Sequence, residues 1–175
     1  MVGNSLRVGN GYDIHRLVDG VPLILGGVRI EYERGLHGHS DGDVLTHAII
    51  NALLGAAALG DIGMHFPPGD PQYKGANSLD LLQKAHQLIQ QRGFQIGNID
   101  SMIICERPKL SPFYSSMRQS LSDALSIDID NVSVKASTAE GLGTIGSGEA
   151  IAAHAVAILI PQPSEAATVI REPGV

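Results

Sequence analysis

The chain has 175 residues, of which 43% are hydrophobic and 17% are charged, and its formal net charge is −6. This length and composition predict one compact domain, over residues 1–160. The tail over residues 161–175 has two early prolines and little pattern, which predicts disorder. The negative charge and the absence of a Lys/Arg cluster exclude a generic nucleic-acid binder, and the single cysteine excludes an internal disulfide. No apolar run reaches the roughly 18 residues of a membrane span, and we expect a cytoplasmic or mature organellar protein without a signal peptide.

Strand patterns occupy the first part of the chain. Residues 6–15 alternate well enough for a strand, and its glycines permit the close approach of another segment. Asp13 and His15 are two positions apart, so an extended backbone points both side chains to the same face. A glycine pair then separates two short apolar runs and predicts a β-hairpin with strands at residues 21–25 and 28–30.

A loop at residues 35–40 leads into an apolar helix. Ser40 and Asp43 are spaced as a capping box, in which the Ser40 hydroxyl caps the helix and Asp43 reaches back to it. The apolar face continues until Gly60 ends the helix. His47 follows Asp43 by four residues and lies on the same side. Because polar groups in a buried helix need a partner, this first turn indicates a hydrogen-bonded, ligand or metal site.

The second half of the chain predicts further helices and strands. These are a helix capped by Ser78 and ended by Gly93, a strand at 99–105, a helix started by Ser111-Pro112, a strand at 132–136, a glycine-rich loop at 137–148 and a strand at 150–160. The last strand is nearly all apolar, which predicts burial on both faces with His154 as a hydrogen-bonded core residue. The order of elements predicts an α+β fold, a two-layer sandwich with helices on one face of a mixed β-sheet.

The first candidate site combines Asp13, His15 and His47. A strand supplies two of these side chains and the start of a helix supplies the third. Two imidazoles and a carboxylate suit zinc and leave a fourth position open, as catalytic zinc sites require. The same ligand types also suit iron(II). The alternative is that the three residues are unrelated polar residues on the surface and bind no metal.

The second candidate site is the loop that begins with Ser137, Thr138, Ala139 and Glu140. Hydroxyls and unhindered backbone N–H groups after a strand can cradle phosphates, and the Glu140 carboxylate could hold Mg²⁺ together with phosphate oxygens. A third stretch, residues 105–110, is a strand end that could form the wall of a pocket for a ring-shaped ligand group.

Together these stretches resemble a known family. The motifs are Gly11-Tyr-Asp-Ile-His-Arg16, His39-Ser-Asp-Gly-Asp-Val-Leu-Thr-His47, Leu59-Gly-Asp-Ile-Gly63 with Phe66-Pro67, Glu106-Arg-Pro-Lys-Leu110 and Thr138-Ala-Glu-Gly-Leu-Gly143. In this order they resemble the 2-C-methyl-D-erythritol 2,4-cyclodiphosphate synthases of the non-mevalonate isoprenoid pathway, over roughly residues 6–160.

The resemblance implies a homotrimer with active sites at subunit interfaces, in the bacterial cytoplasm or the plastid stroma. The substrate would be 4-diphosphocytidyl-2-C-methyl-D-erythritol 2-phosphate. Its 2-phosphate attacks the β-phosphorus of the cytidine diphosphate group, CMP leaves, and a cyclic diphosphate forms. Since neither a water nucleophile nor a covalent enzyme intermediate is needed, catalysis would be positioning and charge stabilisation.

The resemblance also assigns residues by position. It implies that Asp13, His15 and His47 bind zinc, one ion per subunit. It also implies that Glu140 binds a magnesium or manganese ion together with the substrate. It further implies that His39 and Thr138 stabilise the transition state. Residues assigned to substrate binding are Asp13, His15, His39 and Ser40; Asp61, Ile62, Gly63, Phe66 and Asp70 for the erythritol part; and Cys105, Glu106, Arg107, Pro108, Lys109, Leu110, Ser111, Ser137, Thr138, Ala139 and Glu140 for the cytidine diphosphate part.

Two positions depart from the family pattern. Ser147 stands where an arginine is usual and Thr144 where a phenylalanine is frequent, which puts in doubt an ancillary diphosphate or isoprenoid cavity on the trimer axis. Two other functions use the same residues. One is a zinc or iron(II) hydrolase or oxygenase, which needs a water-activating base, and the other is a non-catalytic nucleotide-binding trimer, whose metal would be closed by four protein ligands.

Overall fold

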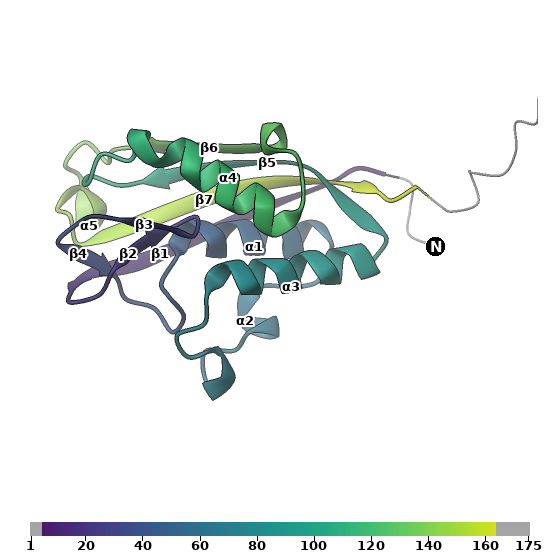
Figure 1. Ribbon diagram of the computed structural model, residues 1–175, viewed down its shortest axis with the longest axis horizontal. Coiled ribbons are helices and arrows are strands. Elements are labelled where there is room, and N and C mark those ends of the chain that lie inside the picture. Colours follow the sequence, from purple (N-terminus) through teal and green to yellow (C-terminus); the bar gives the residue numbers. More distant parts are fainter. Residues whose placement is uncertain (1–4, 164–175) are drawn as a thin grey trace, which may run out of the picture.

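A computed structural model describes residues 5–163 (Figure 1). The strands are β1 (Arg7–Asp19), β2 (Leu23–Leu25), β3 (Val28–Ile30), β4 (Arg34–Leu36), β5 (Phe94–Ile104), β6 (Val132–Ser137) and β7 (Ala150–Pro161). The helices are α1 (Val44–Ala56), α2 (Ile62–His65), α3 (Ser78–Gln91), α4 (Tyr114–Leu125) and α5 (Gly143–Gly146), with 3₁₀ turns η1 (Pro71–Tyr73), η2 (Ser111–Phe113) and η3 (Ile129–Asn131). Within this range no helix has the length and apolar character to cross a membrane.

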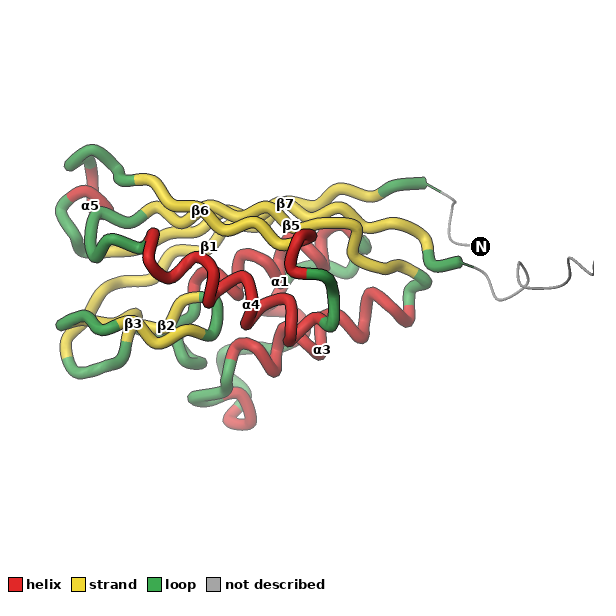
Figure 2. Tube along the Cα trace, turned by 45° about the horizontal axis from the view of Figure 1, so that its top comes forward, coloured by secondary structure: helices red, strands yellow, loops and turns green. Residues whose placement is uncertain are grey.

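The main sheet has five strands in the order β4-β1-β7-β5-β6. The β5–β6 pair is parallel and the other pairs are antiparallel, so the sheet is mixed. Figure 2 shows this sheet as one layer and α1, α3 and α4 as a second layer on one of its faces. The predicted α+β sandwich of a mixed sheet with helices on one face is therefore confirmed.

Small residues on β1 allow α1 to lie directly on the sheet. A Cβ atom added at Gly9 would lie 2.0 Å from the Ala52 carbonyl oxygen, and one at Gly11 would lie 1.9 Å from the Ala48 carbonyl oxygen. No side chain fits in such a space, so glycine is required at both positions. The segment whose close approach the sequence predicted is thus α1.

The helix cap of α1 differs from the prediction. Asp43, and not Ser40, is the N-cap, and the helix ends at Ala56 rather than near Gly60. The Asp43 carboxylate accepts hydrogen bonds from the Thr46 N–H and hydroxyl and also from the N–H groups of the hairpin turn, at Gly26 and Gly27. Full burial raises the pKa of Asp43, and these hydrogen-bond donors compensate in part for the cost of burying its carboxylate.

The last strand, β7, is not buried on both faces as predicted. His154 and Val156 point to the face of the sheet opposite the helices, and both are exposed. The ring of His154 lies 4.7 Å from the ring of Tyr12 on β1, so it is a surface residue stacked on its neighbour rather than a core residue. None of the described helices covers this outer face of β7 (Figure 2), so burial within one chain does not account for its apolar side chains.

Other boundaries differ by a few residues. Asn77 caps α3 in place of Ser78, and Ser111-Pro112 opens a 3₁₀ turn before α4 rather than α4 itself. The segments predicted as loops, residues 35–40, 61–71 and 137–148, contain the short elements β4, α2 and α5. Pro161 pairs with Phe94 inside the sheet, whereas the rest of the predicted tail, from residue 164, lies outside the described residues.

Candidate functional site

The predicted triad comes together in the structure. Asp13 and His15 lie on β1, on the face that packs against α1, and His47 lies in the first turn of α1. Asp13 Oδ2 is 2.8 Å from His15 Nε2 and 2.9 Å from His47 Nδ1, and the two ring nitrogens are 3.2 Å apart. One potential ligand atom from each residue lies within 4.8 Å of the others.

The chemistry of these atoms fits a cation. His15 Nδ1 lies 2.6 Å from the His37 carbonyl oxygen, and because that oxygen only accepts, Nδ1 must carry the hydrogen. The lone pair of neutral His15 is then on Nε2 and faces both Asp13 and His47. A carboxylate oxygen and two ring nitrogens at such distances require a proton or a cation among them. A hydrogen bond from the second ring nitrogen to a backbone carbonyl, as His15 makes here, is typical of metal-ligating histidines.

Electrostatics keep the carboxylate ionised. Burial favours the neutral form of Asp13, but hydrogen bonds from His15 and His47 outweigh it and hold the pKa of Asp13 below its usual range. Burial likewise opposes charge on His15, yet its bond to Asp13 raises the pKa of His15. The site therefore attracts positive charge, whether as a proton or as a metal ion.

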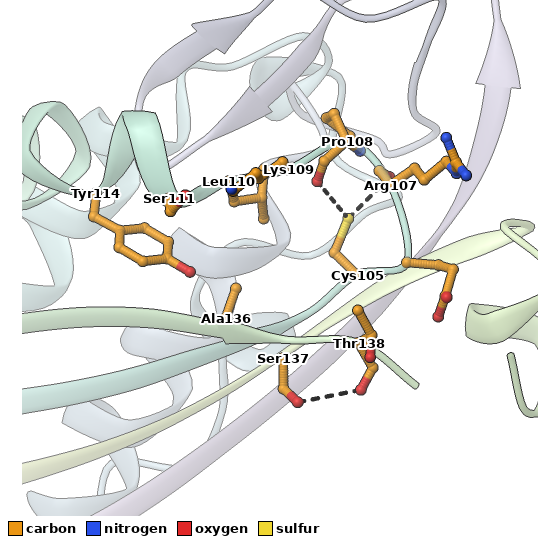
Figure 3. Close-up of a pocket in the computed structure, with 11 residues that line it drawn as sticks. Cys105, Arg107, Pro108, Lys109, Leu110, Ser111, Tyr114, Ala136, Ser137 and Thr138 are labelled. Atoms are coloured by element: carbon orange, nitrogen blue, oxygen red, sulfur yellow. Dashed lines mark hydrogen bonds between the residues drawn. The ribbon is translucent and has the colours of Figure 1, made fainter. Parts of the chain in front are cut away.

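A cavity of about 420 Å³ lies at the carboxyl ends of β5 and β6 (Figure 3). Its lining comprises Cys105, Glu106, Arg107, Pro108, Lys109, Leu110, Ser111, Tyr114, Ala136, Ser137 and Thr138. It contains every residue of the predicted nucleotide stretches except Ala139 and Glu140. Burial raises the pKa of the Cys105 thiol to about 12, so this side chain is a neutral wall of the cavity and not a nucleophile.

Tyr114 is a lining residue that the sequence reasoning missed. It is the first residue of α4, and its ring extends toward Ala136 across the cavity (Figure 3). The available signal was its position one turn after Leu110, the end of the predicted pocket wall, at the start of the next helix. Ser78, which contacts His47, and Asp41, which contacts Ser78, were missed as well.

The loop after β6 makes its own hydrogen bonds. The Thr138 hydroxyl donates to Glu140 Oε1 at 2.7 Å, and Glu140 adopts a positive φ of 52°. The Glu106 carboxylate accepts from the N–H groups of Ala139 at 3.2 Å and Gly141 at 3.4 Å. These backbone N–H groups, which the sequence predicts to bind phosphates, therefore donate to Glu106 in this structure.

The remaining predicted residues form two neighbouring loops. His39 is exposed; its Nε2 lies 3.3 Å from the Asp70 carbonyl oxygen, and its own carbonyl accepts from the Gly75 N–H at 2.8 Å. Asp61 caps α2, which contains Ile62 and Gly63, and Phe66 packs edge-on against Tyr73. Among the described residues no hydrogen bond links the α2 segment to the triad.

The two halves of the predicted site stay apart within one chain. At the level of Asp13 the sheet continues through Ala153 on β7 to Ile103 on β5, near the cavity. Both of these intervening side chains are completely buried. Packed side chains of the helix-facing layer therefore separate the triad from the cavity.

Comparisons with known sequences agree with the motifs. The model of the YgbB family matches residues 6–160. The 2-C-methyl-D-erythritol 2,4-cyclodiphosphate synthase of Cyanothece sp. is 62% identical over 156 residues, which cover 89% of this chain and 97% of that protein. The synthase of Gloeobacter violaceus is 58% identical over 157 residues, with coverages of 90% and 96%.

Solved structures share the fold. The Plasmodium falciparum IspF in complex with CDP aligns with a TM-score of 0.81 at 38% identity, over 92% of this chain and 99% of that chain. The bifunctional IspDF of Campylobacter jejuni aligns with a TM-score of 0.87 at 41% identity, over 90% of this chain but only 42% of that longer chain.

Proposed function

The chain belongs to the YgbB family, and we infer that it carries out the reaction for which its relatives are named, the synthesis of 2-C-methyl-D-erythritol 2,4-cyclodiphosphate. It converts 4-diphosphocytidyl-2-C-methyl-D-erythritol 2-phosphate to this product and releases CMP, in the non-mevalonate isoprenoid pathway. The observation that carries this conclusion is 62% identity across 97% of the Cyanothece synthase. This match favours the synthase over the hydrolase, oxygenase and binding-module alternatives that the triad alone left open.

The reaction is an intramolecular phosphoryl transfer. The 2-phosphate oxygen forms a bond to the β-phosphorus, and the bond from that phosphorus to the CMP oxygen breaks. Since both reacting groups belong to one substrate, the protein has to fold the molecule and neutralise its phosphates. It acts as a metal-dependent phosphorus–oxygen lyase.

We assign the cavity at β5 and β6 to the cytidine diphosphate group. Its size, the hydroxyls of Ser137 and Thr138 and the cationic side chains of Arg107 and Lys109 support this assignment. We further propose that the Thr138 hydroxyl hydrogen, which Glu140 accepts in the ligand-free chain, turns to a substrate phosphate. The exposed His39 would contact the phosphates from the neighbouring loop.

We propose that Asp13, His15 and His47 hold zinc. Two imidazoles and one carboxylate match the ligand types of zinc and leave a position for a substrate oxygen. When bound there, the ion supplies positive charge that stabilises the phosphate oxygens. Glu140 is the carboxylate that we assign to a second ion, magnesium or manganese, which binds together with the substrate.

We propose that three copies assemble through the outer face of the sheet. This face exposes large apolar side chains at Val8 (69%), Tyr12 (48%), Ile14 (42%) and Val156 (44%). Contiguous exposed apolar surface on a sheet indicates an interaction site. The proposal also accounts for the apolar character of β7 on both faces.

Assembly would complete the active site. Within one chain Ala153 and Ile103 fill the space between the triad and the cavity, so one substrate does not reach both across the helix-facing layer. A cavity from a neighbouring copy, placed beside the triad, removes this obstacle. We therefore place each active site at an interface between copies.

The test supplies the purified protein with the cytidylylated substrate, Zn²⁺ and Mg²⁺. We expect CMP release together with a new cyclic diphosphate in the phosphorus NMR spectrum. CMP release with only open-chain phosphates would identify a hydrolase and overturn the assignment. Sedimentation of the same preparation should give the mass of a trimer.

A further inference from the structure

His47 has contacts on the side of its ring that faces away from Asp13. Its Nε2 atom lies 2.9 Å from Ser78 Oγ and 3.0 Å from Ser40 Oγ. Ser78 is the first residue of α3 and is completely buried, 31 positions from His47 in the chain. A residue of a different helix therefore holds the outer edge of this imidazole.

The direction of the hydrogen bond follows from a third residue. The Ser78 hydroxyl lies 2.5 Å from Asp41 Oδ1 and donates to it, while the Ser78 N–H donates to Asp41 Oδ2 at 2.9 Å. A serine hydroxyl has one hydrogen, which the carboxylate takes, so toward His47 the oxygen can only accept. Nε2 must then carry a hydrogen, and the lone pair of the neutral His47 ring is on Nδ1.

We propose that Ser78 and Asp41 are positioning residues for the metal site, which they serve by holding His47 with Nδ1 toward Asp13 and His15. The proposal rests on the function proposed above, in which Nδ1 of His47 binds zinc. A carboxylate that orients a ligating histidine is a common arrangement, and here a serine is inserted between the two. Neither residue contacts the three potential ligand atoms directly.

The same contacts join the loops around the site. The Asp41 N–H donates to the Ala76 carbonyl at 3.1 Å, and Asp41 Oδ1 also accepts from the Asp43 N–H at 3.2 Å. Asp41 thus fastens the start of α3 to the cap of α1. The direction of the His47 ring depends on how these two helix starts are held together.

The principal test is Ser78→Ala, with Ser122→Ala as matched control. Ser122 is also a buried helical serine, but its hydroxyl donates to the Gln119 carbonyl, away from the site. We expect Ser78→Ala to weaken zinc binding about 10- to 100-fold in competition with a chelator, as loss of an outer partner does in other metal sites. Ser122→Ala should bind zinc as the wild type does.

Thermal unfolding separates positioning from a structural role. Zinc that binds only the folded protein raises its melting temperature by an amount that depends on affinity. We expect Ser78→Ala to retain much less of this zinc-dependent increase than Ser122→Ala does, whatever its melting temperature without zinc. In the zinc-loaded wild type, the His47 Nε2 hydrogen should exchange slowly, and in Ser78→Ala it should exchange faster.

A second variant, Asp41→Asn, tests the hydrogen bonds from His47 through Ser78 to Asp41 even if Ser78→Ala folds poorly. An asparagine offers one acceptor oxygen where the carboxylate offers two, so the Ser78 hydroxyl becomes free to donate to Nε2 of His47. The hydrogen of the neutral ring would then be on Nδ1, the atom proposed to bind zinc. We expect a similar loss of zinc affinity. Zinc affinity within twofold of wild type in both folded variants would overturn the proposal, whereas a wild-type protein that binds no zinc would instead refute the proposed metal site.

Discussion

Asp13 Oδ2 lies 2.9 Å from His47 Nδ1, although the two residues are 34 positions apart in the chain. The contact exists because Gly9 and Gly11 let α1 lie directly on β1. The same packing that builds the core therefore brings a strand carboxylate to the first turn of a helix.

Replacement of His47 tests the metal site. His47→Ala removes one of three ligands, and we expect zinc content and turnover to fall together, turnover by at least about 100-fold because charge stabilisation at the phosphates is lost. His86→Gln is the control, since His86 is a half-buried histidine of α3 outside the triad. Metal analysis and a CMP-release assay measure both effects. Full zinc content in His47→Ala would show that the ligands are assigned wrongly.

His39 should behave differently from His47. Its side chain is exposed and contacts a backbone carbonyl, not the triad. His39→Ala should therefore keep one zinc per chain and lower kcat by about 100- to 1000-fold, the range for loss of one donor that stabilises charge in the transition state. A loss of zinc equal to that in His47→Ala would assign His39 to the metal instead.

Glu140 should affect the second ion alone. Glu140→Gln keeps the shape of the side chain and removes its charge, so we expect a higher Mg²⁺ requirement, lower turnover and unchanged zinc content. Titration of Mg²⁺ with and without CDP measures this. Because the site is incomplete without phosphates, the wild type should bind Mg²⁺ weakly until CDP is added. Tight binding to the ligand-free protein would contradict the assignment.

The pKa shifts in the triad predict how stability of the zinc-free protein depends on pH. The folded pKa of Asp13 is lowered, so its contribution is present above the ordinary value of 3.8 and is lost as pH falls through the folded pKa. The folded pKa of His15 is raised, so its contribution is complete below 6.5 and is lost as pH rises through the folded pKa.

The zinc-free protein should accordingly lose unfolding free energy as pH rises above 6.5. Urea unfolding at several pH values measures this, and His15→Asn should flatten the alkaline part of the profile. Added zinc should remove the loss as well, since deprotonated imidazoles bind the ion more strongly. An alkaline loss that persists unchanged in His15→Asn would trace it to other groups.

Two glycines at the α1–β1 contact should respond in opposite ways. Gly11→Ala places a methyl group 1.9 Å from the Ala48 carbonyl oxygen, and we expect it to destabilise the fold by at least about 1–3 kcal/mol. Gly55→Ala, in α1, meets its nearest atom at 3.8 Å and should stabilise the helix by up to about 1 kcal/mol. Urea unfolding of both variants compares them, and equal stabilities would contradict the described packing.

Local patterns in the sequence determined the parts of this protein that depend on short distances along the chain. Alternation placed Asp13 and His15 on one face of a strand, and the ordered motifs identified the family before any contact was known. The α+β layer arrangement also followed from the order of elements. In each case the information lies within a few neighbouring residues or in the order of recognisable segments.

Tertiary structure decided what depends on partners far away in the chain. Asp43 became the cap of α1 instead of Ser40 because the hairpin turn supplies additional donors to its buried carboxylate. His154 lies on an outer face that no described helix covers, and periodicity alone does not distinguish that face from a buried one. Ser78 meets His47 only because two helix starts pack together, and hydrogen-bond directions of this kind depend on positions accurate to a fraction of an ångström, which no local pattern encodes.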